Sequence, residues 1–176
     1  SESDRIRAIV KKVVDESKES LKRLKEETER VKRELDRVLK ENKDKVRRLK
    51  EKAEEMKKLE DRKALKKVVD ELRDALRESE EHIRKVLEDN ERVLRRVEKE
   101  VKDDIRRLEK ILEDIERELR SDVLREVAER VTRLIRDSER VLEELAREHE
   151  KASRKVKKVL DESKKIVDDV IRRVDR

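Results

Sequence analysis

The aliphatic residues of this chain recur every three or four positions over long stretches. The first stretch runs from Ile6 to Met56 in 14 steps of about 3.6 residues, which is the period of an α-helix. Its members, including three polar residues in phase, are Ile6, Val10, Val13, Ser17, Leu21, Leu24, Thr28, Val31, Leu35, Val38, Asn42, Val46, Leu49, Ala53 and Met56. A coiled coil has an ideal period of 3.5 residues. The pattern therefore predicts a long amphipathic helix with weak supercoiling.

The stripe loses its phase at two places. Beyond Met56 the same spacing reaches only charged residues, whereas the aliphatic series restarts at Leu65. The second loss of phase follows Leu119, and the series restarts at Leu124. An unbroken helix keeps its phase, so each break predicts a turn. The predicted helices cover about residues 3–59, 61–120 and 121–176.

Cap residues stand where these helices should begin. Asp61 and Ser121 are candidate N-caps of the second and third helices, and Ser3 or Asp4 is the candidate for the first. Short turns between helices of similar length place neighbours antiparallel. We therefore expect an all-α fold, a single elongated, antiparallel, up-down-up three-helix bundle over residues 1–176 that resembles a coiled coil. Residue i of the first helix should lie level with about residue 120 − i of the second helix and about residue i + 120 of the third.

Polar residues interrupt the stripes at positions that this register places level with one another. An unpaired polar side chain costs about 1–3 kcal/mol when it is buried. Only the register that pairs such side chains avoids this cost, so we expect them to form polar core layers that specify helix register. The three sets are Ser17 with Ser138, Thr28 with Asn90 and His149, and Asn42 with Ser79 and Ser163.

The composition excludes several kinds of site. The chain has 176 residues, of which 59% are charged, and it has no Gly, Pro, Cys, Phe, Tyr or Trp. Without Cys there is no disulfide, thiolate zinc site or cysteine nucleophile. Without Gly there is no P-loop or dinucleotide fingerprint. Without aromatic residues there is no platform on which nucleic-acid bases could stack.

The sequence resembles de novo designed helical bundles with buried hydrogen-bond networks, of the long three-helix type. The resemblance covers the whole chain. It rests on the aliphatic stripes, the level polar sets described above, and surfaces of interleaved Glu, Lys and Arg. A spectrin-like repeat would be the natural counterpart, but its core carries aromatic residues. The resemblance implies a scaffold or assembly component made without a natural substrate. Many designed loops carry Gly, and neither predicted turn here does.

The two histidines are the only candidates for metal or acid-sensitive chemistry. The register separates His82 from His149 by about 15 Å, too far for one metal ion. We expect His149 to be a buried member of its polar set, where acid would place a charge in the core, and His82 to lie at the core edge. No residues suit a catalytic triad, since a continuous helix offers no oxyanion hole. We therefore expect no enzyme activity, no metal and no cofactor.

The remaining expectations concern partners and location. The net charge of +6 is spread among interspersed acids, so we expect no specific nucleic-acid partner. The N-terminus lacks the apolar core of a signal peptide, and no apolar run could span a membrane. We expect a soluble protein, suited to recombinant cytoplasmic expression, that requires no partner. The alternative is a self-associating or helix-binding component of a designed oligomer or heterodimer, because three helices can leave a groove for a fourth.

Overall fold

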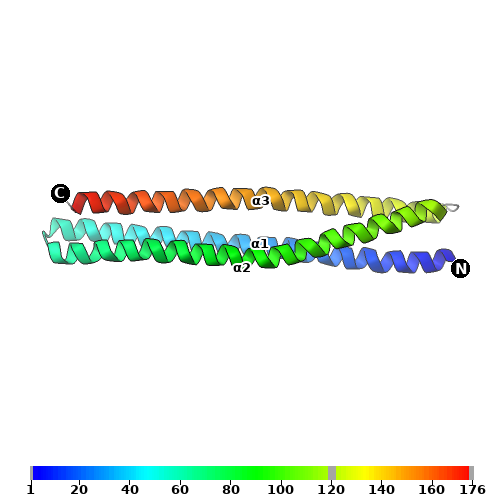
Figure 1. Cartoon of the computed structure of the whole chain (residues 1–176), viewed down its shortest axis with the longest axis horizontal. Helices are drawn as coiled ribbons and strands as arrows, with labels where there is room; N and C mark the ends of the chain where they lie inside the picture. The colour runs from blue at the N-terminus through cyan, green and yellow to red at the C-terminus, as the bar shows by residue number, and fades with distance from the viewer. Residues whose placement is uncertain (1, 119–121, 175–176) are drawn as a thin grey trace. The chain divides into compact units, whose positions relative to one another are not determined.

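The computed structural model of the chain describes residues 2–118 and 122–174. Three α-helices account for nearly all of them, α1 (Glu2–Lys58), α2 (Arg62–Glu118) and α3 (Asp122–Val174), and no strand lies within these ranges (Figure 1). The helices pack against one another, which confirms the predicted all-α three-helix bundle. The second predicted turn, with Leu119 and Ser121, lies outside the described residues.

The start of α1 differs from the prediction. Ser3 and Asp4 were expected to cap the helix, but the helix begins at Glu2 and includes both. Because an N-cap residue has a non-helical backbone, neither of them is the cap. Ser and Asp are both common at N-caps. Residue type alone, however, does not show at which position the backbone first becomes helical.

The turn between α1 and α2 is closed by two backbone hydrogen bonds. The N–H of Asp61 donates to the carbonyl of Met56 at 3.2 Å, and that of Glu60 donates to Lys57 at 3.1 Å. This pair of bonds is the Schellman motif, which usually places Gly at the left-handed position. Here Glu60 occupies that position, with φ of 56°. The chain thus makes the turn without Gly, at the cost of a strained glutamate backbone.

Asp61 directly precedes α2 and caps its N-terminus. Its Oδ1 accepts a hydrogen bond from the backbone N–H of Ala64 at 3.0 Å, and its carbonyl accepts the first helical bond from Leu65 at 3.0 Å. The carboxylate thereby satisfies one of the N–H groups that have no partner within the helix. The predicted N-cap at Asp61 is confirmed.

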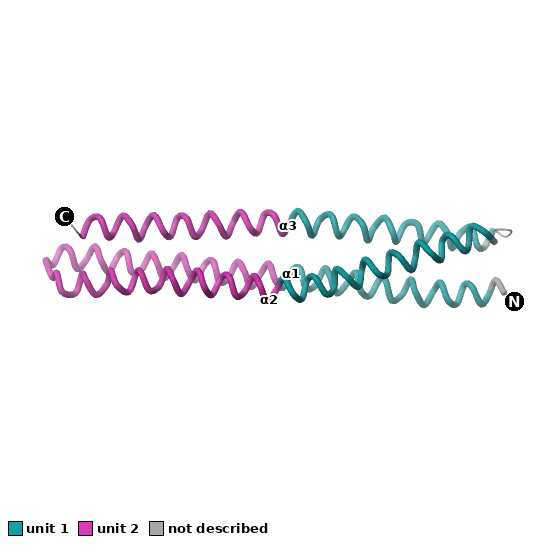
Figure 2. Tube along the Cα trace, in the orientation of Figure 1, with its two compact units in different colours: residues 1–30, 91–148 teal, residues 31–90, 149–176 magenta. Residues whose placement is uncertain are grey.

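The chain divides into two compact units, and each takes a segment from all three helices (Figure 2). Unit 1 comprises Ser1–Arg30 and Glu91–Glu148, and unit 2 comprises Val31–Asn90 and His149–Arg176. Unit 1 has one continuous aliphatic core. Its buried members are Val10, Val13, Leu21, Leu24, Val97, Val101, Ile105, Leu108, Ile115, Leu124, Val131, Leu134 and Ile135.

Unit 2 has two aliphatic clusters instead of one. One cluster consists of Leu35, Val38, Leu39, Ile83, Val86, Val156 and Val159. The other consists of Ala53, Leu65, Val68, Val69, Leu72, Val167 and Val170. Along α1 and α3 the polar residues Asn42 and Ser163 fall between the members of the two clusters. The core of unit 2 is therefore interrupted at the height of these residues.

Ion pairs between helices define the register within each unit. In four α1–α2 ion pairs, the residue of α1 numbered i contacts residue 123 − i of α2. The pairs are Glu16–Arg107 and Arg23–Glu100 in unit 1, and Lys45–Glu78 and Lys52–Glu71 in unit 2. In unit 2, residues of α1 and α3 that bond lie 119 residues apart for Asp36–Lys155 and 121 apart for Asn42–Ser163.

The direction of helical side chains explains why 123 exceeds the predicted 120. A side chain leans towards the N-terminus of its own helix, so it covers a spot about one position before its Cα atom. In an antiparallel pair the two leans add, and side chains meet about two positions beyond the level of their Cα atoms. In a parallel pair the leans cancel, and the α1–α3 contacts at 119 and 121 bracket the predicted offset of 120.

Candidate functional site

In unit 2, a hydrogen bond between two buried polar residues joins α1 to α3. Asn42 on α1 donates from Nδ2 to Oγ of Ser163 on α3 at 2.9 Å. Asn42 is 4% exposed and Ser163 is 3% exposed, so the bond is excluded from water. Each residue continues the core stripe of its helix. The structure thus brings together two of the three residues in this predicted set.

The third member of the set is placed differently. Ser79 on α2 is half-buried, and its hydroxyl makes no hydrogen bond with the part of the chain that the structure describes. The second polar atom of Asn42, Oδ1, is buried and has no hydrogen-bond partner among the described residues. An amide with one bonded and one unbonded polar atom is only half satisfied.

Two hydroxyl groups of the predicted sets in unit 1 bond to their own helix, α1. Ser17 is 3% exposed, and its Oγ donates to the carbonyl of Val13 at 2.7 Å. Thr28 is half-buried and donates in the same way to Leu24 at 2.7 Å. Bonds of this kind satisfy a buried hydroxyl without a partner on another helix. Ser138, the predicted partner of Ser17, is buried at 2% exposure.

The remaining predicted set draws on both units, with Thr28 in unit 1 and Asn90 and His149 in unit 2. Asn90, in unit 2, is 6% exposed and donates from Nδ2 to Oε2 of Glu34 at 3.3 Å. Glu34 lies on α1, one helical turn before Val38, and is half-buried. The buried amide of Asn90 is therefore bonded to a carboxylate on the neighbouring helix.

The expectations for the two histidines were wrong. His149 and His82 are both exposed, so neither is a member of the buried core or lies at its edge. His149 is in phase with Leu145 and Ala152, but these residues are themselves only half-buried. The stripe of α3 is shallow at this height, and an imidazole there reaches water. His149 is therefore not a buried member of its predicted polar set.

A polar seam lies between α1 and α2 of unit 1, and its Ser20 and its ion pairs were missed in the sequence. Ser20 is 5% exposed, and Asp104 retains only 13% of its side-chain exposure. Nη1 of Arg107 bridges Glu16 at 3.0 Å and Asp104 at 3.7 Å. Asp104 Oδ2 is nevertheless buried and has no hydrogen-bond partner among the described residues. Ser20 lies three residues after Ser17, and this helical spacing is the signal that could have identified it.

A second ion pair lies in the same seam. Nη2 of Arg23 lies 3.2 Å from Oε2 of Glu100 and donates to Oγ of Ser20 at 3.4 Å. Oε2 of Glu100 is also buried without an aligned hydrogen-bond donor in the described part of the chain, so the contact with Arg23 is an ion pair only. The seam contains two guanidinium groups and three carboxylates, which gives the two helices a specific pairing in this unit.

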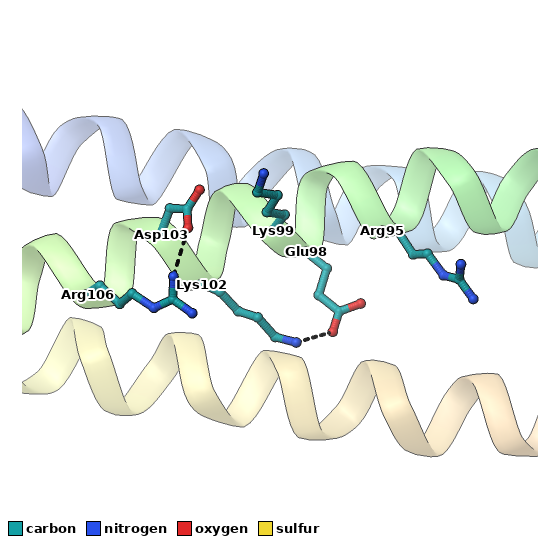
Figure 3. A pocket seen from close by; sticks show the side chains of 6 residues that line it. All are labelled: Arg95, Glu98, Lys99, Lys102, Asp103 and Arg106. Atoms are coloured by element: carbon teal, nitrogen blue, oxygen red, sulfur yellow. Dashed lines mark hydrogen bonds and ion pairs between the residues drawn. The ribbon is translucent and has the colours of Figure 1, made fainter.

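A shallow hollow of about 390 Å³ on the outer face of α2 is lined entirely by charged side chains (Figure 3). Arg95, Lys99, Lys102 and Arg106 follow one another at helical spacing. Lys102 is paired with Glu98 at 2.9 Å, Arg106 with Asp103 at 3.5 Å and Arg95 with Glu91 at 2.6 Å. Interspersed carboxylates therefore neutralise most of this basic stripe, as the sequence pattern predicted.

The described residues contain no group of three or more His, Cys, Asp or Glu arranged to hold a metal ion. Within the same ranges, none of the helices is both long enough and apolar enough to cross a membrane. In comparisons with known proteins, no family model, curated protein or solved structure matches the chain.

Proposed function

We propose that the chain is a designed structural scaffold without a natural biochemical activity, in which polar residues inside an aliphatic core hold the helices in one register. The observation that carries this proposal is the buried hydrogen bond between Asn42 and Ser163. It joins α1 and α3, which are not consecutive in the chain. A turn can restrain consecutive helices, whereas α1 and α3 need contacts of their own.

The sequence around Ser163 supports a role in register. A slip of α3 by seven residues in either direction would place Val156 or Val170 opposite Asn42. The amide would then lie against aliphatic side chains with no partner, which costs about 1–3 kcal/mol. Aliphatic side chains alone discriminate poorly between such registers, since every slip by a heptad offers another aliphatic layer.

The composition supports a designed origin. Long helices built from Val, Leu, Ile, Glu, Lys and Arg, with no Gly or Pro in the whole chain, follow propensity and pattern at almost every position. The Schellman turn at Glu60 ends α1 and the N-cap at Asp61 starts α2, and neither feature uses Gly or Pro.

Crosslinking tests the role in register. The chain has no Cys, so introduced cysteines react alone. In the native register, Oδ1 of Asp36 on α1 lies 2.7 Å from Nζ of Lys155 on α3. Glu162 is one heptad beyond Lys155. D36C/K155C therefore reports the native register, and D36C/E162C reports a slip of one heptad.

In an otherwise unchanged chain, a short thiol crosslinker should join D36C to K155C efficiently and should not join D36C to E162C. Adding N42L and S163V should raise the yield of D36C/E162C several-fold. Adding L39I, an aliphatic exchange within the neighbouring cluster, should change neither yield. If the N42L/S163V background reacts only in the native register, the polar pair does not hold that register and the proposal fails.

A further inference from the structure

Each helix has one long stretch in which no aliphatic side chain is buried. Among the described residues, these stretches cover 25–34 on α1, 87–96 on α2 and 136–155 on α3. The last residues before the unit boundaries lie inside them, and they are Arg30, Asn90 and Glu148. The division of the chain into two units therefore coincides with a break in the buried aliphatic series of every helix.

The half-buried aliphatic residues in these stretches add to the core of one unit each. Leu94 and Leu145 belong to unit 1 and pack against its core. Leu87 and Ala152 belong to unit 2 and pack against the cluster that contains Leu35. Burial of apolar surface is the main favourable contribution to folding, and here each unit supplies its own. The loss of one core does not by itself remove the other.

The packing of unit 1 is incomplete near the start of α1. Ile9 is 55% exposed and lies beside an apolar groove of about 320 Å³. Ile6 and Ile111, which also line the groove, are only half-buried. Apolar surface that stays in contact with water in the folded state contributes nothing to stability. In unit 2 the exposed large aliphatic residue is Leu59, which lies in the turn after α1 and not on a helix.

Unit 1 also buries charged oxygen atoms that lack a hydrogen-bond donor among the described residues. These atoms are Oε2 of Glu100 and Oδ2 of Asp104, whereas the corresponding atom in unit 2 is Oδ1 of Asn42. Withdrawing a carboxylate from water costs more free energy than withdrawing a neutral amide. Opening of unit 1 returns both carboxylates to water. The groove and the carboxylates therefore both favour opening of unit 1 over opening of unit 2.

We propose that unit 1 opens as a cooperative unit of its own while unit 2 stays folded. The bond between Asn42 and Ser163 lies in unit 2, so α1 and α3 remain joined there when the core of unit 1 is open. When unit 1 closes again, its helices continue from segments that are already in register. This inference goes beyond the proposed function and does not depend on it.

Hydrogen exchange of the full chain, measured by mass spectrometry of peptic fragments, tests the proposal. The conditions are those in which the exchange rate follows the opening equilibrium, and only amides away from the helix ends are compared. In the unchanged chain, the amides of unit 1 should exchange faster than those of unit 2. A single cooperative unit would instead give the same opening equilibrium for both.

L108A in unit 1 and L72A in unit 2 form a matched pair, because both leucines are 0% exposed. L108A should speed exchange in unit 1 at least about tenfold. L72A should speed exchange in unit 2 by a similar factor and leave the amides of unit 1 within about twofold of their original rate. If either variant loses its helical circular dichroism, L108V and L72V replace the pair, with a smaller change expected in the same units.

D104L tests why unit 1 opens first. It replaces a carboxylate that is 13% exposed with an apolar side chain, and Arg107 keeps Glu16 as an ion-pair partner at 3.0 Å. Exchange in unit 1 should slow at least about threefold, since the carboxylate no longer has to be withdrawn from water. D74L, at an exposed aspartate of α2 in unit 2, should leave exchange in unit 1 unchanged.

Three outcomes would overturn the proposal. L72A could speed exchange in both units equally, which would make the chain one cooperative unit. Unit 2 could exchange faster than unit 1 in the unchanged chain, or D104L could speed exchange in unit 1, and either result would remove the reason for opening at unit 1. None of these outcomes bears on the crosslinking test, which reports the register of folded α1 and α3.

Discussion

The hydrogen bond between Asn42 and Ser163 leads to opposite predictions for its two partners. S163A removes the acceptor and leaves the whole Asn42 amide buried without a partner. N42L removes the amide, including the Oδ1 atom that already has no partner among the described residues. The Ser163 hydroxyl that remains can donate to the carbonyl four residues earlier, as Ser17 does to Val13 at 2.7 Å.

The magnitudes follow from these environments. S163A should lower the free energy of unfolding by about 1–3 kcal/mol, the cost of a buried polar group without a partner. N42L loses a hydrogen bond worth about 0.5–1.5 kcal/mol but buries a leucine side chain worth about 1.5–3 kcal/mol. Since Asn42 is 4% exposed and has an aliphatic cluster on either side along the helix, N42L should be neutral or stabilising by up to about 2 kcal/mol.

A double-mutant cycle in guanidinium chloride, followed by far-UV circular dichroism, measures these effects. In the N42L background, S163A should change the free energy of unfolding by less than about 0.5 kcal/mol, and the m-values should stay constant. The argument is refuted if S163A is harmless in the parent while N42L is destabilising by more than about 1 kcal/mol. That result would mean that the Asn42 amide is fully satisfied in solution.

Substitutions at four other positions follow from the structure. E60G should raise the free energy of unfolding by about 0.5–1 kcal/mol because φ of 56° suits glycine, whereas E60A should give no such gain in the same denaturation assay. D61A should cost about 0.5–2 kcal/mol by removing the acceptor of the Ala64 N–H, and D61S should recover most of that loss. L72A, at a side chain that is 0% exposed, should lower the free energy of unfolding by about 2–5 kcal/mol. H149Q should change the free energy of unfolding by less than about 0.5 kcal/mol in the same assay, because His149 is exposed; a larger loss would contradict its placement.

The helical period predicted much of the fold and part of the candidate site. The phase shift between Met56 and Leu65 predicted a turn, and the turn lies there with Asp61 as the N-cap. Asn42 and Ser163 were predicted to be level and buried, and they bond to each other. These predictions succeed because a helix repeats every 3.6 residues, so sequence spacing fixes which side chains share a face.

The expectations that failed concern depth and side-chain direction. His149 has the phase of a core residue but is exposed, and Ser20 is buried beside the stripe that was expected to hold the core. Phase states which way a residue points from its own helix axis. How deeply it lies depends on the neighbouring helices, and the half-buried Leu145 and Ala152 show that this part of α3 is shallow.

The sequence by itself determined that the chain forms helices, where the first turn lies, and which face of each helix turns towards the core, since all three follow from local propensity and spacing. Only the tertiary structure decided the contacts between helices. It brings Arg107 to Glu16 and Asp104, leaves Asn42 Oδ1 without a described partner, and opens the groove beside Ile9. Such features depend on how side chains from distant segments lean and interdigitate, and no periodicity along one helix contains that information.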